Sequence, residues 1–140
     1  TLYCADREIY QTLKTIPSPQ TELTLVADPV DNSTDIIQAD LVIGRAGRNL
    51  LSELIALGKR GIVVPVSAEK FRAGNQLQTA EMAVKLNPNL HLALVQDGYD
   101  AFRDTLRHAI AANYQPIHWQ PGNDTALVVI QEFLSEGRGS

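Results

Sequence analysis

One stretch of this chain, residues 39–65, constrains the fold more than any other, because two apolar runs flank a glycine-bearing turn and a helical pattern. The pattern predicts, in order, a buried strand over 40–43, a tight turn over 44–47, a helix from about residue 49 to 57 and a strand over 62–64. Such a unit places backbone N–H groups and the positive end of a helix dipole at the carboxyl edge of a parallel sheet. Because α/β folds bind phosphorylated ligands at that edge, the pattern indicates a nucleotide site.

The rest of the chain continues this alternation of short β-rich runs with helical patterns. It predicts a Rossmann-like three-layer α/β/α fold with a mostly parallel sheet of about five strands. Further strands are expected over 2–4, 23–27 and 90–95, and further helices over 7–14, 33–38, 68–86, 99–112 and 125–135. Asn32 or Ser33 is expected to cap the helix at 33–38. The expected core residues of the helix at 68–86 are Leu77, Ala80, Met82, Ala83 and Leu86.

Length and composition predict one soluble domain over residues 1–136, with 137–140 as a flexible tail or a cloning scar. A net charge of −4 without a Lys/Arg run argues against a nucleic-acid partner. The single cysteine, Cys4, rules out an internal disulfide and a cysteine-based zinc cluster, and the histidines lack metal-ligand spacing. No metal or other cofactor is therefore expected. Without a signal peptide or an apolar run of ~20 residues, the expected location is the cytoplasm.

The turn and the helix after it supply the first candidate binding residues. Gly44 and Gly47 would let the backbone approach a ligand's phosphates or base, and Arg45 could add charge-assisted hydrogen bonds. The alternative, which the GxxG pattern alone favours, is a turn that needs glycine only for its dihedral angles. Glu53 could accept hydrogen bonds from two vicinal hydroxyls, such as those of a ribose. Its alternative role, equally supported by the residues alone, is a solvated charge on the helix.

Asn75 and Gln76 form a second polar group, ahead of a helical stretch and about ten residues after Pro65. Both side chains donate and accept hydrogen bonds, which suits a ligand's hydroxyls or phosphate oxygens. Helix capping by Asn75 and simple exposure of Gln76 are the alternatives, and the residues alone favour them.

These motifs together resemble the carboxyl-terminal domain of family 28 glycosyltransferases, GT-B enzymes related to the bacterial UDP-GlcNAc transferase that makes lipid II. The resemblance is carried by Ala39-Asp40-Leu41-Val42-Ile43, Arg45-Ala46-Gly47, Ser52-Glu53-Leu54, Ala56-Leu57-Gly58-Lys59 and Val63-Val64-Pro65. Residues 75–80, Asn-Gln-Leu-Gln-Thr-Ala, stand where the family has its Gln-x-x-Asn-Ala motif. In this family the carboxyl-terminal half binds the nucleotide sugar, usually UDP-linked, and the amino-terminal half supplies the acceptor site and the catalytic base.

The resemblance implies a role for each candidate residue. Glu53 would bind the ribose, and Gly47 would open the helix whose amino end faces the diphosphate. Gly44 and Arg45 would lie near the base. Gln76 would face the donor sugar and the phosphates.

Several positions depart from the family pattern. Arg48, Asn49 and Leu50 stand where a small residue and a Thr or Ser are frequent. A hydroxyl for the diphosphate is therefore missing, and Asn49 is its candidate replacement. Arg60 stands where proline is usual and Thr79 where asparagine is usual, and the second change weakens the glutamine motif.

A larger departure concerns the first strand. The family opens this domain with a strand and a glycine-rich loop, whereas the run at residues 2–4 resembles the strand that follows them. With the usual strand order, the absent strand would be the central one, and its loss would leave unpaired backbone groups and an uncovered apolar strip. We therefore expect a rearranged sheet, a homodimer that hides the open edges, or a longer parent chain.

The leading hypothesis is the UDP-sugar-binding half of a metal-independent glycosyltransferase that transfers a hexosyl group to an acceptor. Its partner would be an amino-terminal acceptor domain or a partner subunit, peripheral membrane association would be a property of the full-length parent, and this chain alone would be inactive. The alternative is a non-catalytic interaction or ligand-sensing domain with a degenerate donor site. A response-regulator-like or flavodoxin-like domain ranks last, because Asp6 stands alone after the first strand.

Overall fold

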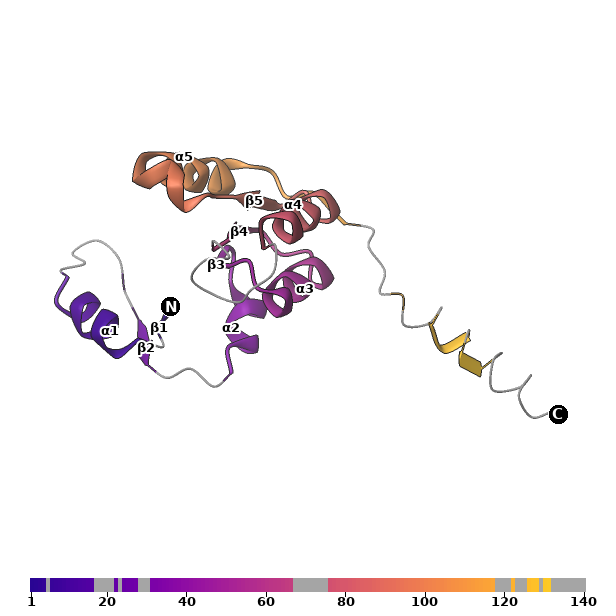
Figure 1. Cartoon of the computed structure of the whole chain (residues 1–140), viewed down its shortest axis with the longest axis horizontal. Coiled ribbons are helices and arrows are strands. Elements are labelled where there is room, and N and C mark those ends of the chain that lie inside the picture. The colour runs from indigo at the N-terminus through magenta and orange to yellow at the C-terminus, as the bar shows by residue number, and fades with distance from the viewer. Residues whose placement is uncertain are drawn as a thin grey trace. The chain divides into compact units, whose positions relative to one another are not determined.

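The computed structural model describes residues 1–4, 6–16, 22, 24–27, 31–66, 76–117, 122, 126–128 and 130–131. All strand pairs among these residues are parallel, and helices alternate with the strands along the chain (Figure 1). This arrangement confirms the predicted α/β class. The chain divides into two compact units, residues 1–39 and 40–140. A single donor-binding domain over residues 1–136 stays a prediction, and the tail at 137–140 lies outside the described residues.

The first unit contains a two-stranded sheet. β1 (Leu2–Cys4) pairs with β2 (Leu25–Ala27), and α1 (Arg7–Lys14) lies between them in the chain. The carboxylate of Asp6 accepts hydrogen bonds from two backbone N–H groups in the first turn of α1, at 2.9 and 3.0 Å. Asp6 is therefore a helix cap.

The second helix of this unit, α2 (Ser33–Gln38), has a different cap from the one predicted. Asn32 occupies the position before the helix but makes no side-chain capping hydrogen bond. Instead the carboxylate of Asp31 accepts hydrogen bonds from the backbone N–H and the hydroxyl of Ser33, at 2.9 and 2.7 Å. These two bonds lower the pKa of the Asp31 carboxyl below its ordinary value, because they stabilise its charged form.

The second unit is built on a three-stranded parallel sheet with the order β3–β4–β5. Its strands are β3 (Val42–Arg45), β4 (Gly61–Val64) and β5 (Leu90–Leu92). The predicted strands are thus present, but the prediction of one sheet of about five strands is corrected to separate sheets of two and three. Among the described residues, β3 is an edge strand of the larger sheet, and its only strand neighbour is β4. β3 also extends through Gly44 and Arg45, which the sequence pattern had placed in the turn, because both residues still pair with β4.

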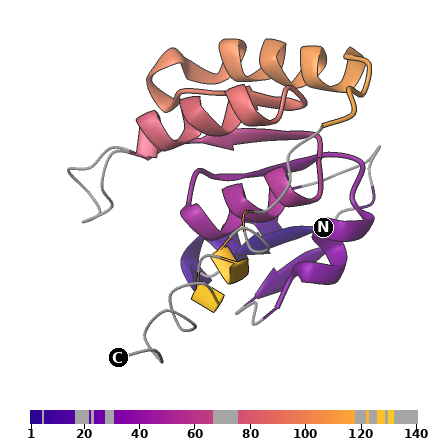
Figure 2. The same cartoon turned by 90° about the vertical axis from the view of Figure 1, so that its right-hand side faces the viewer.

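Helices cover both faces of the larger sheet. α3 (Arg48–Ala56) and α4 (Gln76–Leu86) pack against each other on one face, where Leu54 lies within 3.5 Å of a Cβ added at Gly61. α5 (Gly98–Ala111) follows a short 3-10 turn at Val95–Asp97 and covers the opposite face. Figure 2 shows α5, in orange, along the top of this unit. The core under α5 joins Ile62, Ala93 and Ala109 with Leu41, Val64, Phe102 and Leu106.

The predicted core of α4 is confirmed only in part. Ala80 and Ala83 are buried, whereas Leu77, Met82 and Leu86 are 39%, 59% and 45% exposed. The alanine stripe faces the neighbouring elements because α4 packs closely against α3 and β5. Residues 68–75 of the predicted helix lie outside the described residues. Residues 126–128 and 130–131 are helical, as expected for part of the predicted helix at 125–135.

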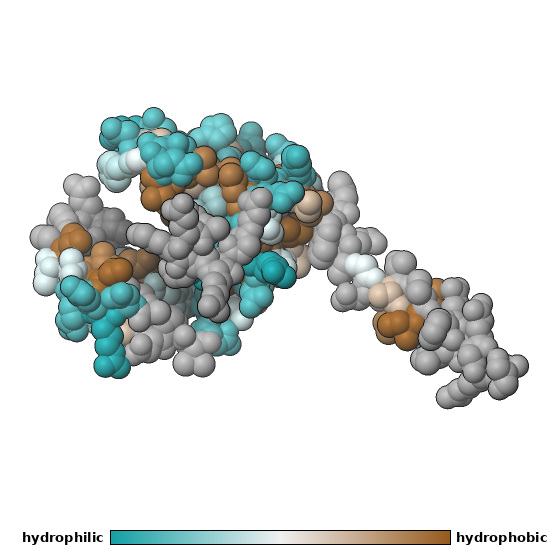
Figure 3. Space-filling model, in the orientation of Figure 1, coloured by the Kyte–Doolittle hydropathy of each residue, from teal (hydrophilic) through white to brown (hydrophobic). Residues whose placement is uncertain are grey.

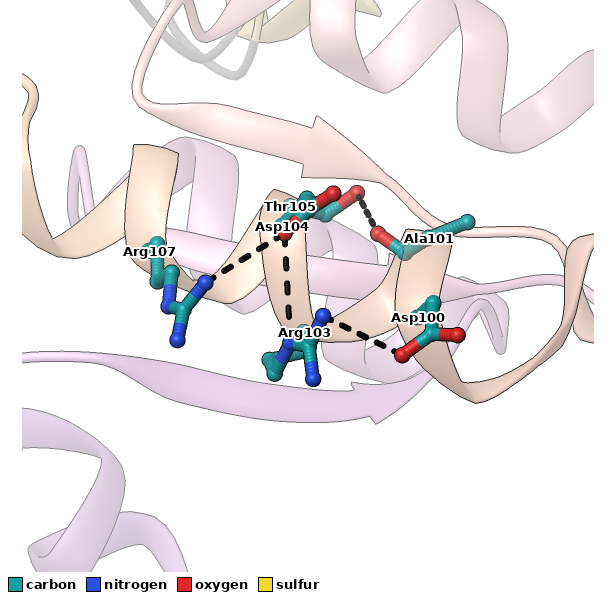
Figure 4. Close-up of polar contacts among 6 residues, drawn as sticks. All are labelled: Asp100, Ala101, Arg103, Asp104, Thr105 and Arg107. Atoms are coloured by element: carbon teal, nitrogen blue, oxygen red, sulfur yellow. Dashed lines mark hydrogen bonds and ion pairs between the residues drawn. The ribbon is translucent and has the colours of Figure 1, made fainter.

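The outer face of α5 is charged and solvated. Arg103 lies 3.1 Å from a carboxylate oxygen of Asp100 and 3.9 Å from one of Asp104, and Arg107 lies 3.7 Å from Asp104 (Figure 4). Hydrophilic side chains gather over this helix at the top of the molecular surface in Figure 3. Exposed pairs of this kind contribute about 0–1 kcal/mol each, so they mark a solvent-facing surface rather than a source of stability.

Two buried asparagines form hydrogen bonds at the amino edge of the larger sheet. Asn87 is fully buried, and its side-chain N–H groups donate to the carbonyls of Leu54 and Lys59, at 3.0 and 2.9 Å. Asn89 donates to the carbonyl of Gln115 and accepts from the N–H of the same residue, both at 2.7 Å. The run Asn87-Pro88-Asn89, which follows α4, therefore ties the end of α3 to the start of β4.

Candidate functional site

The candidate site lies at the carboxyl edge of β3 and β4. Beyond the end of β3, the N–H of Ala46 still donates to the carbonyl of Val64, at 2.9 Å, and Ala46 is almost fully buried. The N–H of Gly47 donates to the carbonyl of Arg45 at 2.7 Å, which turns the chain into α3. The start of α3 is thus anchored to the sheet edge by backbone hydrogen bonds.

The amino end of α3 is suited to an anion. Gly47 precedes the helix with extended backbone angles and supplies no side-chain cap, and the first turn carries no acidic residue. By helix geometry the first N–H groups have no acceptor within the helix, and they carry the positive end of its dipole. Arg48 and Asn49 are exposed on the same turn. Their donors and the helix dipole all favour a negatively charged group here.

The exposed face of α3 also carries Glu53, the residue predicted to bind the ribose. Asn49, Ser52 and Glu53 are exposed, whereas Leu51 and Leu54 are buried. Glu53 therefore projects from the solvent-facing side of α3, one helical turn after Asn49.

Gly44 in β3 and Gly47 just before α3 differ in the atoms that surround them. A Cβ added at Gly44 would lie 2.4 Å from Cδ2 of Leu50, so this position has to be small for Leu50 to pack. A Cβ at Gly47 would meet nothing closer than the carbonyl oxygen of Arg45, at 4.0 Å. Neither residue has a positive φ, which Gly58 and Gly98 do have. The dihedral-angle explanation for these two glycines is therefore wrong, and neither packing nor backbone angle accounts for Gly47.

Gln76 is the first residue of α4 and lies at the same sheet edge. Its side-chain oxygen accepts a hydrogen bond from the N–H of Val66, at 3.2 Å, two residues after β4 ends. This bond ties the amino end of α4 to the edge that also carries Gly44, Arg45 and Gly47. Asn75 lies outside the described residues.

Comparison with known proteins assigns the family. The model of the glycosyltransferase family 28 C-terminal domain matches residues 10–96, which is more than half of the chain. The chain belongs to this family. Its strand–helix–strand unit around α3 and its α4 thus lie inside the matched region of a family 28 C-terminal domain, as the resemblance predicted.

Two curated relatives of this family 28 domain come from streptococci. Both are named "UDP-N-acetylglucosamine--N-acetylmuramyl-(pentapeptide) pyrophosphoryl-undecaprenol N-acetylglucosamine transferase". The protein of Streptococcus sanguinis (strain SK36) is 31% identical over 107 residues, 73% of this chain and 30% of that protein. The protein of Streptococcus pneumoniae serotype 19F (strain G54) is 33% identical over 87 residues, 59% of this chain and 24% of that protein. The chain therefore spans less than a third of the length of these relatives. No solved structure matches it.

Among the residues that the structure describes, no three His, Cys, Asp or Glu side chains are grouped so that they could hold a metal ion. Likewise, none of the described helices has the length and apolar character needed to cross a membrane.

Proposed function

We propose that this chain is the donor-binding half of a metal-independent glycosyltransferase and that it binds a UDP-sugar. The observation that carries the proposal is the exposed face of α3, which combines an uncapped, cationic amino end with a carboxylate further along the same helix. Family membership and the names of the relatives support the choice of a nucleotide sugar. The uridine and the sugar are assigned by that similarity.

Each part of the donor has a candidate partner. The diphosphate binds at the start of α3, next to Gly47 and Asn49. Glu53 binds the ribose hydroxyls, and the helical rise of 1.5 Å per residue places it about 9 Å along the axis from Gly47. Gly44 and Arg45 lie beside the base. Gln76, with Asn75 before it, faces the sugar.

Catalysis in such an enzyme consists of positioning and electrostatic stabilisation. As the acceptor oxygen bonds to the anomeric carbon, the bond from that carbon to the diphosphate breaks and UDP leaves with the electron pair. The dipole of α3 and the cationic side chains at its start offset the charge that develops on the diphosphate. No general base is assigned to this chain, so we expect it to bind a donor without transferring the sugar. The acceptor site and the base come from an amino-terminal acceptor domain or a partner subunit. The whole enzyme is cytoplasmic and associates peripherally with the membrane. A homodimer is the alternative assembly.

Titration of the isotope-labelled chain with UDP, UDP-GlcNAc and ADP, followed by amide chemical shifts, tests this proposal. We expect uridine-selective shifts at residues 43–53 and 76. Glu53→Ala should weaken UDP binding about tenfold or more, because hydrogen bonds to a charged group contribute about 1.5–3 kcal/mol. Glu81→Ala is the matched control, since Glu81 is an exposed glutamate on α4.

The alternative function is a non-catalytic module in which Arg48 and Leu50 mark a degenerate donor site. An absence of shifts at millimolar UDP would contradict donor binding and favour this module. So would wild type that binds UDP and ADP equally well, together with a Glu53→Ala variant that binds them as wild type does. Transfer of sugar by the chain alone would contradict the assignment of the base to another domain or subunit.

A further inference from the structure

The fold brings together two histidines that are far apart in the sequence. His91 is the middle residue of β5 and the register partner of Ile62, on the face of the sheet that α5 covers. His108 lies in the last turn of α5, next to Ala109, which is fully buried in the core under that helix. The centroids of the two imidazole rings are 5.2 Å apart, and the ring planes meet at 84°.

One ring nitrogen of this pair lacks a hydrogen bond. Nε2 of His91 is buried, and no described residue bonds to it. A buried polar atom without a partner has lost its hydrogen bond to water and gained none in return, so this nitrogen is available to a ligand. Burial lowers the pKa of His91 below its ordinary value of 6.5, and the nearby His108 and Arg60 lower it further. The ring is therefore neutral at neutral pH, which is the form that binds metal ions.

We propose that His91 and His108 together bind one divalent transition-metal ion, Zn²⁺ or a similar one, between β5 and α5. Neutral imidazole is a ligand that zinc, copper and nickel ions have in common. Tetrahedral ligation with Zn–N bonds of about 2.0–2.1 Å places two imidazole centroids about 5 Å apart, close to the separation in this pair. Water would complete the coordination, because no third His, Cys, Asp or Glu side chain of the described residues joins the pair.

The charges around the pair restrict which ion it takes. The last turn of α5 carries the negative end of the helix dipole, which favours a cation beside His108. Arg60, just before β4, acts in the opposite direction, since its charge already disfavours a positive His91. Binding therefore depends on bonds to imidazole nitrogen rather than on charge alone. Mg²⁺ and Ca²⁺, which prefer oxygen ligands, should not bind here.

The pair lies away from the candidate donor site. His91 follows Asn89, whose side chain bonds at the amino edge of the sheet, whereas the donor site lies at the carboxyl edge of β3 and β4. A metal ion bound to the histidines would take no part in sugar transfer, and its binding does not depend on the proposed function. It would join α5 to β5 and stabilise the folded chain, because the two ligands meet only in the fold.

Calorimetric titration of the chain with Zn²⁺ and with Mg²⁺ at neutral pH tests this site. We expect one Zn²⁺ to bind per chain, no binding of Mg²⁺, and shifts of the ring nitrogens of both His91 and His108 in nitrogen NMR spectra. His108→Ala should weaken Zn²⁺ binding about tenfold or more, because one imidazole ligand remains. His118→Ala and Cys4→Ser are the controls, since they change the third histidine and the single cysteine, and both should bind Zn²⁺ as wild type does.

Thermal unfolding supplies a second measurement. Saturating Zn²⁺ should raise the unfolding midpoint of wild type and leave that of His108→Ala unchanged, because a ligand stabilises the state that binds it. His108 is exposed, so the variant should fold, and its amide spectrum checks this. Equal Zn²⁺ affinity of wild type and His108→Ala, loss of binding in either control, equal binding of Mg²⁺ and Zn²⁺, or no Zn²⁺ binding at millimolar concentration would each overturn the proposal. UDP titration is read separately, so failure of donor binding leaves this result unchanged.

Discussion

The two edges of the larger sheet use polar residues in opposite ways. At the amino edge, Asn87 and Asn89 are buried, and their side chains bond to backbone groups of the segments around them. At the carboxyl edge, Asn49 and Glu53 are exposed on a helix whose buried residues are all apolar. Polar side chains that are buried and fully bonded hold a fold together, whereas exposed ones beside a helix dipole can bond to a ligand. The difference predicts which substitutions damage stability and which damage binding.

The largest effect is expected at Asn87. Asn87→Ala removes the donor that serves the carbonyls of Leu54 and Lys59, and it leaves a cavity in a fully buried place. We expect the free energy of unfolding to fall by about 2–3 kcal/mol, measured by urea denaturation. Asn49→Ala is the matched control at the other edge and should change stability by less than about 0.5 kcal/mol. Equal losses in the two variants would refute the division between the edges.

A smaller loss of stability is expected from a change at Gly44. This residue lies at the carboxyl edge but has a structural role, so it is an exception to the division between the two edges. Gly44→Ala places a Cβ against Leu50 at 2.4 Å, and Leu50 has to move. We expect a loss of about 1 kcal/mol, at the low end of the range for overpacking, because the atom that has to move is the end of a flexible side chain. Gly47→Ala, which has room for its Cβ, should stay within about 0.5 kcal/mol of wild type. Thermal unfolding of the two variants side by side measures this difference, and a larger loss for Gly47→Ala would contradict it.

Sequence patterns predicted the elements near this edge well, because local signals specify them. The apolar run at 62–64 matches the buried strand β4, and the helical pattern from about 49 to 57 matches α3. The buried residues of α3 are Leu51, Leu54 and Ile55, whereas Leu57 is 46% exposed. Glu53 lies on the exposed face of this helix. Whether these residues bind a donor stays a prediction. The ties from Ala46 to Val64 and from Val66 to Gln76 involve backbone groups, which leave no trace in the sequence.

Sequence patterns were less informative where burial or strand pairing depends on a segment that is distant in the sequence. Helical periodicity predicted Leu77, Met82 and Leu86 as core residues. In the structure α4 packs closely against α3 and β5 and buries its alanines instead. Sequence patterns did not indicate the burial of Asn87 and Asn89, because it depends on segments at residues 54–59 and 115 that come together only in the fold. The division into two sheets likewise depends on which strands pair, and strand composition does not specify partners.

The smallest effect, which sharpens the comparison, is expected from His91 in β5, two residues after Asn89. Burial lowers the pKa of His91 below its ordinary value of 6.5, and the nearby His108 on α5 and Arg60 before β4 lower it further. In the unfolded chain the imidazole titrates near 6.5, so below that pH the unfolded state binds more protons than the folded state. The stability contributed by neutral His91 is therefore complete above pH 6.5 and is lost as the pH falls through the folded pKa. His91→Gln cannot titrate, so the difference in unfolding free energy between wild type and variant should shift against wild type on acidification. Denaturation at a series of pH values measures this difference, and the same difference at every pH would show that the amino edge does not disfavour a charge on His91.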